Sequence, residues 1–571
     1  MHKMKASVFL IILSVTISIP INCLPLSQSG RNLTICLGSG CIEGKEVDEG
    51  SYDAFLGIPF AEPPLGHLRF ANPVPAKPWP GILNATVERS DCIQKNILLP
   101  NPTVMGSEDC LYLNVYRPIV PKNVPGNKLL PVMVFIHGGA FFAGSPSPSA
   151  LGPQYFMKNG EVIFVAMSYR LGALGFLSTG DEHSPGNFGF KDQALALRWV
   201  QSNIRAFGGD ENQVTLFGVS AGGAAVQLHM MSPLSQGLFQ RAIVMSGSAI
   251  AAYIKPLKNP YSQAMKQAKV LGIQGVNSKD LVAKLRKVEA QKLVDSIDDL
   301  KYWSIDPLTF YRLVVEHNRT EAFLTQDPKV IWESGQFHHI PWMTGIVQHE
   351  GAVRAAAIVT NKVLLDDLNT KLKDLVPKLM EVECESKSKA DSIYEKLKNY
   401  YLNGSDIVNV DNMQGFIDMF SDRAFLHPYY KSVHSYVHYA DTNQNPVSLY
   451  RFIFKGPMSY SLAYTGTNTD LGVVHLDDTL YLFGSAFPPF PENSVYSNLT
   501  KSLVEFYVSF AKNGRPTHLS KDSVNECTKY HTGPFCDYQE FDNTADGSGF
   551  EVRTNNAVDC KMINFWDEIL Q

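Results

Sequence analysis

Residues 214–223, VTLFGVSAGG, decide the fold that we expect for this chain. The first half is an apolar run with the length of a buried strand, and Ala221 begins a helix pattern. Between them, Ser220 lies in a Gly-x-Ser-x-Gly turn, where the glycines leave room for the sharp strand-to-helix bend of a nucleophile elbow. Ser220 is therefore the candidate nucleophile. The alternative is a glycine-rich turn between two core elements, because the pattern is short enough to occur by chance.

The stretches around this turn alternate between apolar strands and helices. Nearly continuous apolar runs are typical of strands that are covered on both faces, and they occur at 131–136, 162–167 and 241–246. A helix pattern at 188–207 comes before the serine strand. This alternation predicts an α/β fold with a large, mostly parallel central sheet and helices on both faces.

Later segments look like additions to this sheet. Strand-like runs return at 340–345 and 447–454, whereas the charge-rich stretches 261–312 and 362–420 look like helical insertions. Amphipathic helices are expected at 499–512 and 562–570. No repeat or linker interrupts the pattern, so we expect one domain from residue 24 to residue 571.

The N-terminus has the pattern of a secretory signal peptide. Lys3 and Lys5 precede an apolar run at 8–19, with a cleavage point expected after Cys23. The alternative, a membrane anchor, needs a longer apolar run. No second such run and no lipid-anchor tail follows, so we expect a secreted, extracellular protein without a membrane span. A net charge of −5 without a dense basic patch argues against nucleic-acid binding.

Cysteines and glycosylation sequons agree with export. Of nine cysteines, Cys23 leaves with the signal peptide, and an even number remains for disulfides. Near neighbours suggest the pairs Cys36–Cys41, Cys92–Cys110 and Cys527–Cys536, which leaves Cys384 with Cys560. Sequons for N-glycosylation stand at Asn32, Asn84, Asn318, Asn403 and Asn498.

A serine nucleophile needs a base, and the base needs an acid to orient it. In the order Ser, acid, His, both partners follow Ser220 at the ends of later strands. Glu350 follows the strand at 340–345, and His475 lies in a loop after the strand at 447–454. Position alone leaves other acids and bases open: Asp327, Asp477, Asp478, His349 and His427.

Several motifs decide between these alternatives, because the chain resembles the type-B carboxylesterase and cholinesterase-like family of α/β-hydrolases. The resemblance runs over nearly the whole mature length. Its motifs are FLGIPFA at 55–61, LRF at 68–70, EDCLYLNV at 108–115, HGGAF at 137–141, NFGFKDQ at 187–193, FGGD at 207–210 and GVSAGG at 218–223.

The resemblance implies a function and its site residues. Ser220 is then the nucleophile, Glu350 the acid and His475 the base, and the backbone N–H groups of Gly139, Ala140 and Ala221 form an oxyanion hole. It also implies the Cys92–Cys110 disulfide and a small-molecule carboxylic ester as substrate. No metal and no cofactor is implied, and the oligomeric state stays open. Arg69, Glu108 and Asp192 are expected to form structural ion pairs and caps.

Departures from the family pattern bear on the substrate. Cholinesterases carry a tryptophan inside the loop closed by the Cys92–Cys110 disulfide and a glutamate before the serine, a pair that binds cations. Here the loop has no tryptophan and Val219 precedes the serine, which argues against choline esters. The chain is most similar to secreted insect esterases, including juvenile hormone esterases, although these usually have glutamine at the position of Val219. Ala140 stands where many members have a third glycine.

We therefore expect a serine carboxylesterase for apolar esters, such as juvenile hormone, an odorant or a dietary ester. Two alternatives remain: an adhesion-type binding protein on the same fold and a scavenger that is acylated quickly and hydrolysed slowly. The substrate gorge is expected to be lined by aromatic side chains. The candidates are Phe141, Phe142, Tyr464 and Phe483.

Overall fold

The computed structural model describes most of the chain from residue 33 to residue 571. The described residues are 33–48, 51–119, 129–275, 277–382, 384–484, 487–519, 536–556 and 559–571. The predicted signal peptide, the sequon asparagine Asn32 and Cys527 lie outside them. The other sequon asparagines are exposed, which is compatible with glycosylation. They are Asn84, Asn318, Asn403 and Asn498.

A large mixed sheet forms the centre of the structure. Among the described residues it has 11 strands in the order β16-β15-β14-β13-β12-β11-β9-β10-β8-β4-β3. All neighbours from β10 to β15 pair in parallel, and only the strands outside them pair antiparallel. The parallel strands are β9 (Leu130–Ile136), β10 (Ile163–Met167), β11 (Gly209–Val219), β12 (Arg241–Met245), β13 (Trp342–Val347), β14 (Val447–Phe452) and β15 (Tyr538–Asn543). The outer strands are β3 (Lys45–Val47), β4 (Tyr52–Pro59), β8 (Tyr112–Pro118) and β16 (Phe550–Asn555). The predicted α/β class and mostly parallel sheet are confirmed.

Helices cover both faces of the sheet, and the side-chain alternation of each strand explains why. In β9, Val132 and Val134 pack in one apolar cluster with α4 (Phe188–Asn203) and α5 (Ala221–His229). Met133 and Phe135 point the other way, into a second cluster with α2 (Gln154–Asn159) and α16 (Val495–Asn513). Both faces are therefore apolar, which accounts for the uninterrupted apolar runs in the sequence.

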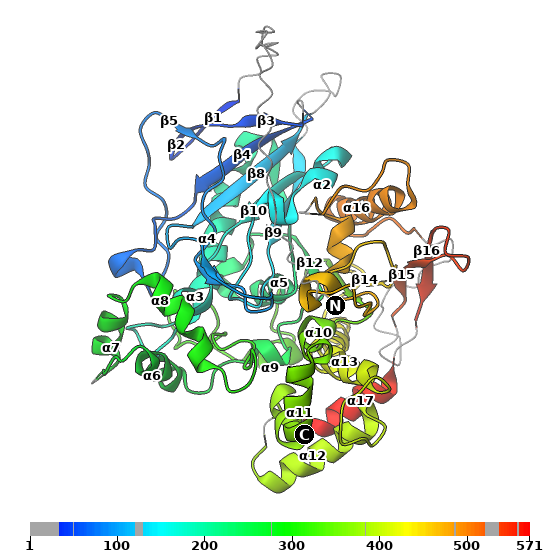
Figure 1. The fold of residues 1–571 in the computed structure, drawn as a ribbon. Helices are drawn as coiled ribbons and strands as arrows, with labels where there is room; N and C mark the ends of the chain where they lie inside the picture. The colour runs from blue at the N-terminus through cyan, green and yellow to red at the C-terminus, as the bar shows by residue number, and fades with distance from the viewer. Residues whose placement is uncertain are drawn as a thin grey trace, which may run out of the picture. The chain divides into compact units, whose positions relative to one another are not determined.

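The predicted helical insertions are present at both expected places. The first contains α6 (Pro260–Val270), α7 (Ser278–Leu285) and α8 (Ala290–Asp295). The second contains α11 (Lys362–Leu379), α12 (Lys387–Tyr401) and α13 (Met413–Ser421). Together with α10 (Ala352–Thr360) and α17 (Cys560–Ile569), the second group has its own apolar cluster. In Figure 1, α11, α12 and α17 lie side by side at the end of the molecule that carries the C-terminus.

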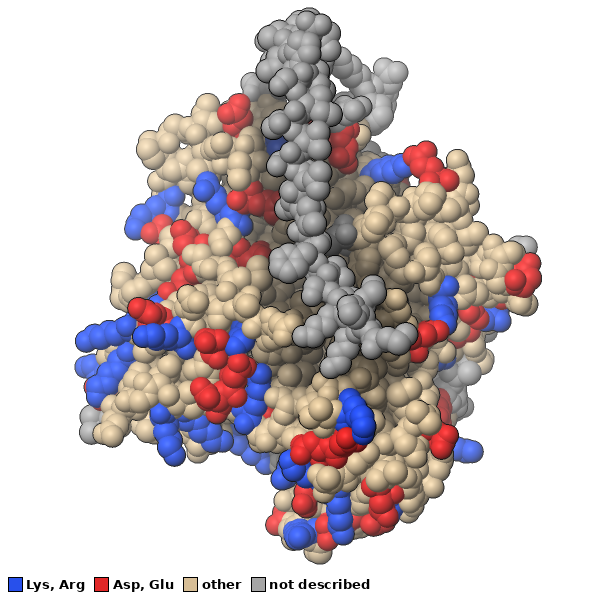
Figure 2. All heavy atoms as spheres, viewed as in Figure 1, with Lys and Arg blue, Asp and Glu red and all other residues tan. Residues whose placement is uncertain are grey.

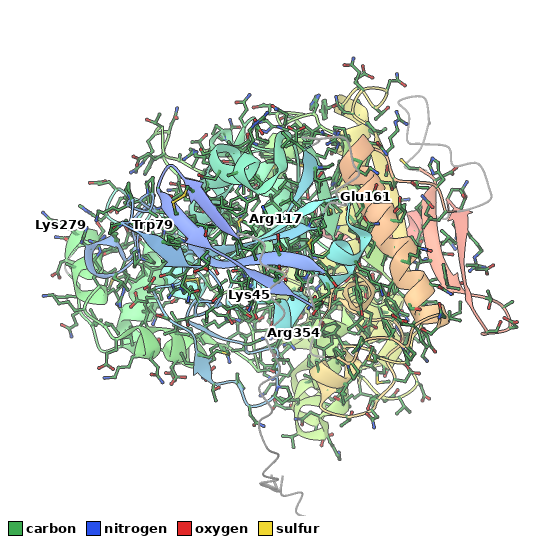
Figure 3. The ribbon with its side chains drawn as sticks, turned by 90° about the horizontal axis from the view of Figure 1, so that it is seen from above. Lys45, Trp79, Arg117, Glu161, Lys279 and Arg354 are labelled. Carbon is green, nitrogen blue, oxygen red and sulfur yellow. A yellow bond between two sulfur atoms is a disulfide. The ribbon has the colours of Figure 1, made fainter. Side chains whose placement is uncertain are left out.

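A small disulfide-closed hairpin begins the described chain. β1 (Thr34–Leu37) pairs with β2 (Gly40–Glu43), and the Cys36–Cys41 disulfide links the two strands. The indole N–H of Trp79 donates to the Cys41 carbonyl at 2.9 Å. Trp79 is labelled in Figure 3, where it lies beside these strands. The Trp79 side chain and the disulfide therefore both stabilise this short hairpin.

The disulfide predictions are confirmed in part. Cys92 is bonded to Cys110 as well as Cys36 to Cys41, and Cys536 is disulfide-bonded. The predicted Cys384–Cys560 pair is wrong, because both thiols are free. That pair followed only from elimination, which ignores the need for Cα atoms within about 7 Å. Cys384 stands between α11 and α12, whereas Cys560 begins α17.

On the face in Figure 2, basic and acidic side chains are interspersed. Within the described residues, no helix has both the length and the apolar character needed to cross a membrane.

Candidate active site

Ser220 stands at the turn between β11 and α5, as the motif predicts. Its backbone has φ 61° and ψ −124°, a strained conformation for a residue with a side chain. The glycines beside it are required by close packing: a Cβ on Gly222 would lie 2.1 Å from the Ile136 carbonyl oxygen. The Ser220 N–H donates to the Met245 carbonyl at 2.8 Å, which ties the turn to the end of β12. The sheet therefore holds the serine at the C-terminal edge of its central strands.

Glu350 and His475 meet at the same edge of the sheet. Glu350 follows β13, His475 follows β14, and these strands are parallel neighbours. The Nδ1 atom of His475 lies 2.5 Å from Oε2 of Glu350, and both side chains are buried. The other carboxylate oxygen of Glu350 accepts from the Val347 N–H at 2.9 Å. The carboxylate is thus fixed at both oxygens and holds the imidazole with Nδ1 as the donor.

The backbone connects these loops to the serine across adjacent strands. The Ser246 N–H, directly after β12, donates to the Gly345 carbonyl of β13 at 2.9 Å. The His349 N–H donates to the Val473 carbonyl, also at 2.9 Å. Among the hydrogen bonds of the described residues, none involves the Ser220 hydroxyl. In an esterase without substrate, the bond from nucleophile to base is often long and tightens only in the reacting complex.

The competing acids and bases have other partners. Asp327 caps α9 (Pro328–Glu333) by accepting from the Lys329 N–H at 2.8 Å. Asp477 accepts from two backbone N–H groups, and His427 pairs with Asp567 at 2.9 Å. His349 contacts Gln414 at 3.0 Å.

Asp478 is fully buried, close enough to Glu350 and His475 for their charges to act on it. It accepts a hydrogen bond from the Tyr450 hydroxyl at 3.3 Å, and the Tyr507 hydroxyl donates to that of Tyr450 at 2.7 Å. Burial raises the pKa of Asp478 to about 7, and the negative charge of Glu350 adds to this shift. The hydrogen-bond partner of Asp478 is therefore a tyrosine hydroxyl, whereas the partner of Glu350 is the His475 imidazole.

The glycine-rich loop after β9 lies against the serine turn. A Cβ on Gly138 would be 3.0 Å from the Cβ of Ser220. Gly139, Ala140 and Phe141 all have positive φ, at 108°, 50° and 63°. Among the hydrogen bonds of the described residues, none is donated by the backbone N–H of Gly139, Ala140 or Ala221. These are the N–H groups that the family resemblance assigns to an oxyanion hole, and their freedom to bind an oxyanion agrees with that role.

The predicted structural ion pairs hold segments next to this loop. The Arg69 guanidinium makes two hydrogen bonds to Glu108. Arg170 contacts both carboxylate oxygens of Asp192, which is fully buried. Two residues beyond Arg170, the Gly172 N–H donates to the Phe141 carbonyl at 2.8 Å. The Arg170–Asp192 pair thus fixes a segment that supports the glycine-rich loop.

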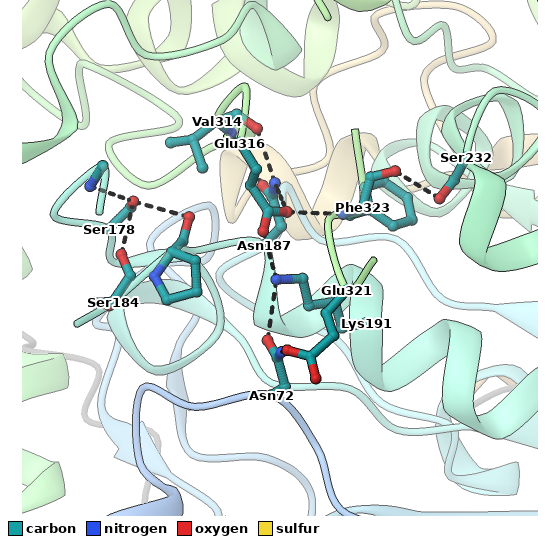
Figure 4. A network of polar contacts seen from close by, with 12 residues as sticks. Asn72, Ser178, Ser184, Asn187, Lys191, Ser232, Val314, Glu316, Glu321 and Phe323 are labelled. Carbon is teal, nitrogen blue, oxygen red and sulfur yellow. Dashed lines mark hydrogen bonds and ion pairs between the residues drawn. The ribbon is translucent and has the colours of Figure 1, made fainter. Parts of the chain in front are cut away.

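A neighbouring buried network fixes the start of α4 (Figure 4). Lys191 donates to Glu316 at 2.6 Å and to Asn72 at 3.0 Å. Asn187, in a left-handed conformation, donates to the other oxygen of Glu316 at 2.8 Å. Burial lowers the pKa of Lys191, which the Glu316 carboxylate opposes. Asn187 and Lys191, from the motif at 187–193, therefore stabilise the start of α4.

Of the four aromatic residues predicted to line the substrate gorge, two border cavities and two are core residues, and neither cavity has Ser220 or His475 among its lining residues. Tyr464 borders a cavity of about 670 Å³ and donates its hydroxyl to the His475 carbonyl at 2.9 Å. Phe142 borders a smaller cavity. Phe141 and Phe483 are instead core residues, each about 1 % exposed. Phe141 packs on Phe176 and Phe190, and Phe483 lies among the phenylalanines of the second sheet cluster.

Sequence reasoning missed some residues that shape the site. The Tyr169 hydroxyl donates to the His137 carbonyl at 3.0 Å, and the Gln94 amide exchanges two hydrogen bonds with the Gly144 backbone. Phe425 lies 4.9 Å from the His475 ring, centre to centre. No motif marks these residues, because each depends on contacts between distant segments.

Known proteins resemble this chain throughout. The sequence model of the Carboxylesterase family matches residues 31–556. Juvenile hormone esterase of Tribolium castaneum is 44% identical over 497 residues, which cover 83% of this chain and 82% of that relative. Venom carboxylesterase-6 of Apis mellifera is 38% identical, with 83% of each chain covered.

The fold of this chain also resembles that of a solved structure. The crystal structure of juvenile hormone esterase from Manduca sexta, with OTFP covalently attached, superposes with a TM-score of 0.78 at 27% identity. The match covers 94% of this chain and 99% of that chain. The fold is therefore that of the α/β-hydrolases. The chain belongs to the Carboxylesterase family, and it is a carboxylic ester hydrolase.

Proposed function

We propose that the protein hydrolyses carboxylic esters of apolar substrates through a Ser220–Glu350–His475 triad and an acyl-enzyme. The observation that carries this proposal is the buried 2.5 Å contact between His475 and Glu350 at the sheet edge where the Ser220 elbow lies. An imidazole whose Nδ1 proton is held by a carboxylate presents its Nε2 as a base.

The reaction then has two steps. The Ser220 Oγ attacks the ester carbonyl carbon while His475 Nε2 takes the hydroxyl proton, and the alcohol leaves with that proton. Water attacks the resulting acyl-enzyme with His475 again as base, which releases the acid and restores the serine. In both steps the oxyanion is stabilised by the N–H groups of Gly139, Ala140 and Ala221. One such donor is worth about 3 kcal/mol of transition-state stabilisation.

Juvenile hormone is the first natural ester to test, because two relatives with similar chains carry the name juvenile hormone esterase. The cavity beside Tyr464 has a mixed lining, in which Leu98, Leu99 and Ile305 lie among charged residues such as Lys301 and Arg354. Val219 is buried in the second sheet cluster and supplies no charge for a choline cation. We also propose that the protein is secreted, on the basis of the N-terminal signal pattern and the disulfides.

The test uses the mature protein, residues 24–571, with nitrophenyl esters and with juvenile hormone. We expect turnover that Ser220→Ala abolishes. Ser202→Ala is the matched control, because Ser202 lies on α4 and bonds only to the Arg198 carbonyl. A single burst of nitrophenol without turnover would indicate the scavenger instead. Folded protein that gives neither burst nor turnover would refute the catalytic assignment and favour the binding protein.

A further inference from the structure

The N–H donors of the proposed oxyanion hole belong to peptide groups whose carbonyls are already held. In a planar trans peptide the C=O and the N–H point in opposite directions, so a bond to the carbonyl also fixes the direction of the N–H. The Ser220 carbonyl accepts from the Ala224 N–H at 2.9 Å, which aims the N–H of Ala221. The Gly139 carbonyl accepts from the Ala143 N–H at 2.9 Å, which aims the N–H of Ala140. Backbone bonds therefore orient two of the donors.

The third donor is oriented by a side chain. The Gly138 carbonyl belongs to the peptide that carries the Gly139 N–H, and it contacts Nδ1 of His137 at 2.8 Å. Among the hydrogen bonds of the described residues, no backbone N–H donates to this carbonyl. The imidazole therefore takes the place that a backbone N–H has at the other two peptides.

The His137 ring is held firmly for this task. It stacks on Tyr169 with ring centres 4.4 Å apart, and the Tyr169 hydroxyl donates to the His137 carbonyl. Both residues are buried. Gly144 packs against Nδ1 so closely that a Cβ there would lie 2.1 Å away. Little space remains for water to replace the bond from Nδ1 to the carbonyl.

The protonation state of the ring is compatible with this bond. Burial lowers the pKa of His137 to about 4, so the imidazole is neutral near pH 7 and carries one N–H. Because a carbonyl oxygen can only accept, that proton must be on Nδ1. His137 thus acts as a hydrogen-bond donor at a fixed tautomer and takes no part in proton transfer to the substrate.

We propose that His137 is a positioning residue, whose Nδ1–H holds the Gly138 carbonyl and so turns the Gly139 N–H toward the substrate oxyanion, with Tyr169 fixing the ring. The inference rests on the proposed function, because His137 has this role only if the Gly139 N–H binds a substrate oxyanion. Its effect belongs to the transition state. Loss of the Nδ1–H should lower kcat much more than it raises KM.

The test compares three substitutions at position 137. In His137→Asn the amide nitrogen takes the place of Nδ1, in His137→Gln the amide nitrogen reaches the place of Nε2, and in His137→Leu no donor remains. We expect His137→Leu and His137→Gln to lower kcat by about 100-fold, as for the loss of one oxyanion donor. His137→Asn should recover most of that loss. The Ki of a trifluoromethyl ketone, whose adduct with a serine carries an oxyanion, should rise in parallel with the fall in kcat.

The results separate this inference from the proposed function. Turnover by the wild type and none by Ser220→Ala supports the triad whatever position 137 does. With that result in hand, a kcat of His137→Leu within about threefold of the wild type overturns the inference. If His137→Leu does not fold, the comparison of Asn with Gln decides, and equal kcat values for these two variants overturn it. Equal losses of kcat and of thermal stability in all three variants also overturn it, because they indicate a purely structural residue.

Discussion

The Nδ1 atom of His475 lies 2.5 Å from Oε2 of Glu350, although 125 positions separate them in the sequence. The contact is dry, since the side chains are 1% and 0% exposed. A carboxylate in such a place orients the imidazole and stabilises the imidazolium that forms when the serine loses its proton.

Replacing this carboxylate should therefore abolish most of the activity. We expect Glu350→Gln to lower kcat by about 10³- to 10⁴-fold, because the amide can donate to Nδ1 and favour the wrong tautomer. Steady-state hydrolysis of a nitrophenyl ester measures the effect. The control is Asp327→Asn, which alters only a helix cap. Activity above about a tenth of the wild type in Glu350→Gln would contradict the assignment of the acid.

Asp478 should make the protein less stable as the pH rises. In the native state the Asp478 carboxyl group keeps its proton up to about pH 7, whereas an aspartate in the unfolded chain loses its proton near pH 4. Between these values the unfolded state binds fewer protons, so the free energy of unfolding falls as the pH increases. A difference of three pKa units corresponds to at most about 4 kcal/mol.

Asp478→Asn should remove this loss, because the amide resembles the neutral acid. Thermal unfolding of the variant and of the wild type is compared at pH 4.5 and pH 8, and the variant should gain Tm only at pH 8. The exposed Asp411→Asn is the control. An equal Tm difference at both pH values would rule out titration of Asp478 as the cause.

Adding a side chain at Gly139 should displace the glycine-rich loop and lower the activity. A Cβ there would lie 2.1 Å from the Ala143 carbonyl oxygen, and φ is 108°. Gly139→Ala must displace the loop, and we expect kcat to fall by about 100-fold, as when one oxyanion donor is lost. Gly160→Ala is the matched control, because Gly160 also has a positive φ but nothing lies within 4 Å of its Cβ position. It should cost about 1 kcal/mol of stability and leave kcat unchanged. Equal kcat losses in the two variants would contradict the steric argument.

Breaking the buried Lys191–Glu316 pair should cost more stability than breaking a surface pair. Both side chains are buried, at 4% and 0% exposure, so Lys191→Met leaves a buried carboxylate without its cation. We expect a loss of about 3 kcal/mol in the free energy of unfolding. Lys362→Met, which breaks an exposed pair with Asp366, should cost under about 0.5 kcal/mol. Denaturant unfolding measures both variants, and similar losses would show that burial of the pair is not decisive.

The sequence predicted the centre of the fold better than its periphery. Strands such as β9 are recognisable because both faces are covered and every residue is apolar. The strands β15 and β16 (Phe550–Asn555) were missed, since β15 has Gln539 and Glu540 among its residues. Those polar side chains are buried by contacts that no local pattern reveals.

The candidate site was predictable to the extent that motifs mark it. Ser220 has a local signature, whereas Glu350 and His475 were selected by resemblance from several acids and bases. Their 2.5 Å contact agrees with that selection. Phe483 was misassigned to the gorge, because an aromatic residue next to a loop has the same appearance in a sequence whether it faces a cavity or the core. Tyr169 was not considered, since its importance comes from a contact with His137.

The hydrogen-bonded pairing of β13 with β14 places the strand before Glu350 beside the strand that leads to His475. The register from Trp342↔Val447 to Val347↔Phe452 fixes where each strand ends, while the chain between them runs through α10 to α13 and then α14 (His427–Tyr439). The ladder therefore fixes where both segments begin, whereas Phe425, from the chain between the strands, packs on the His475 ring with centres 4.9 Å apart. Changes in α11 and α12, which pack in an apolar cluster with their neighbours, should therefore disturb the contact between Glu350 and His475 less than a change at Phe425.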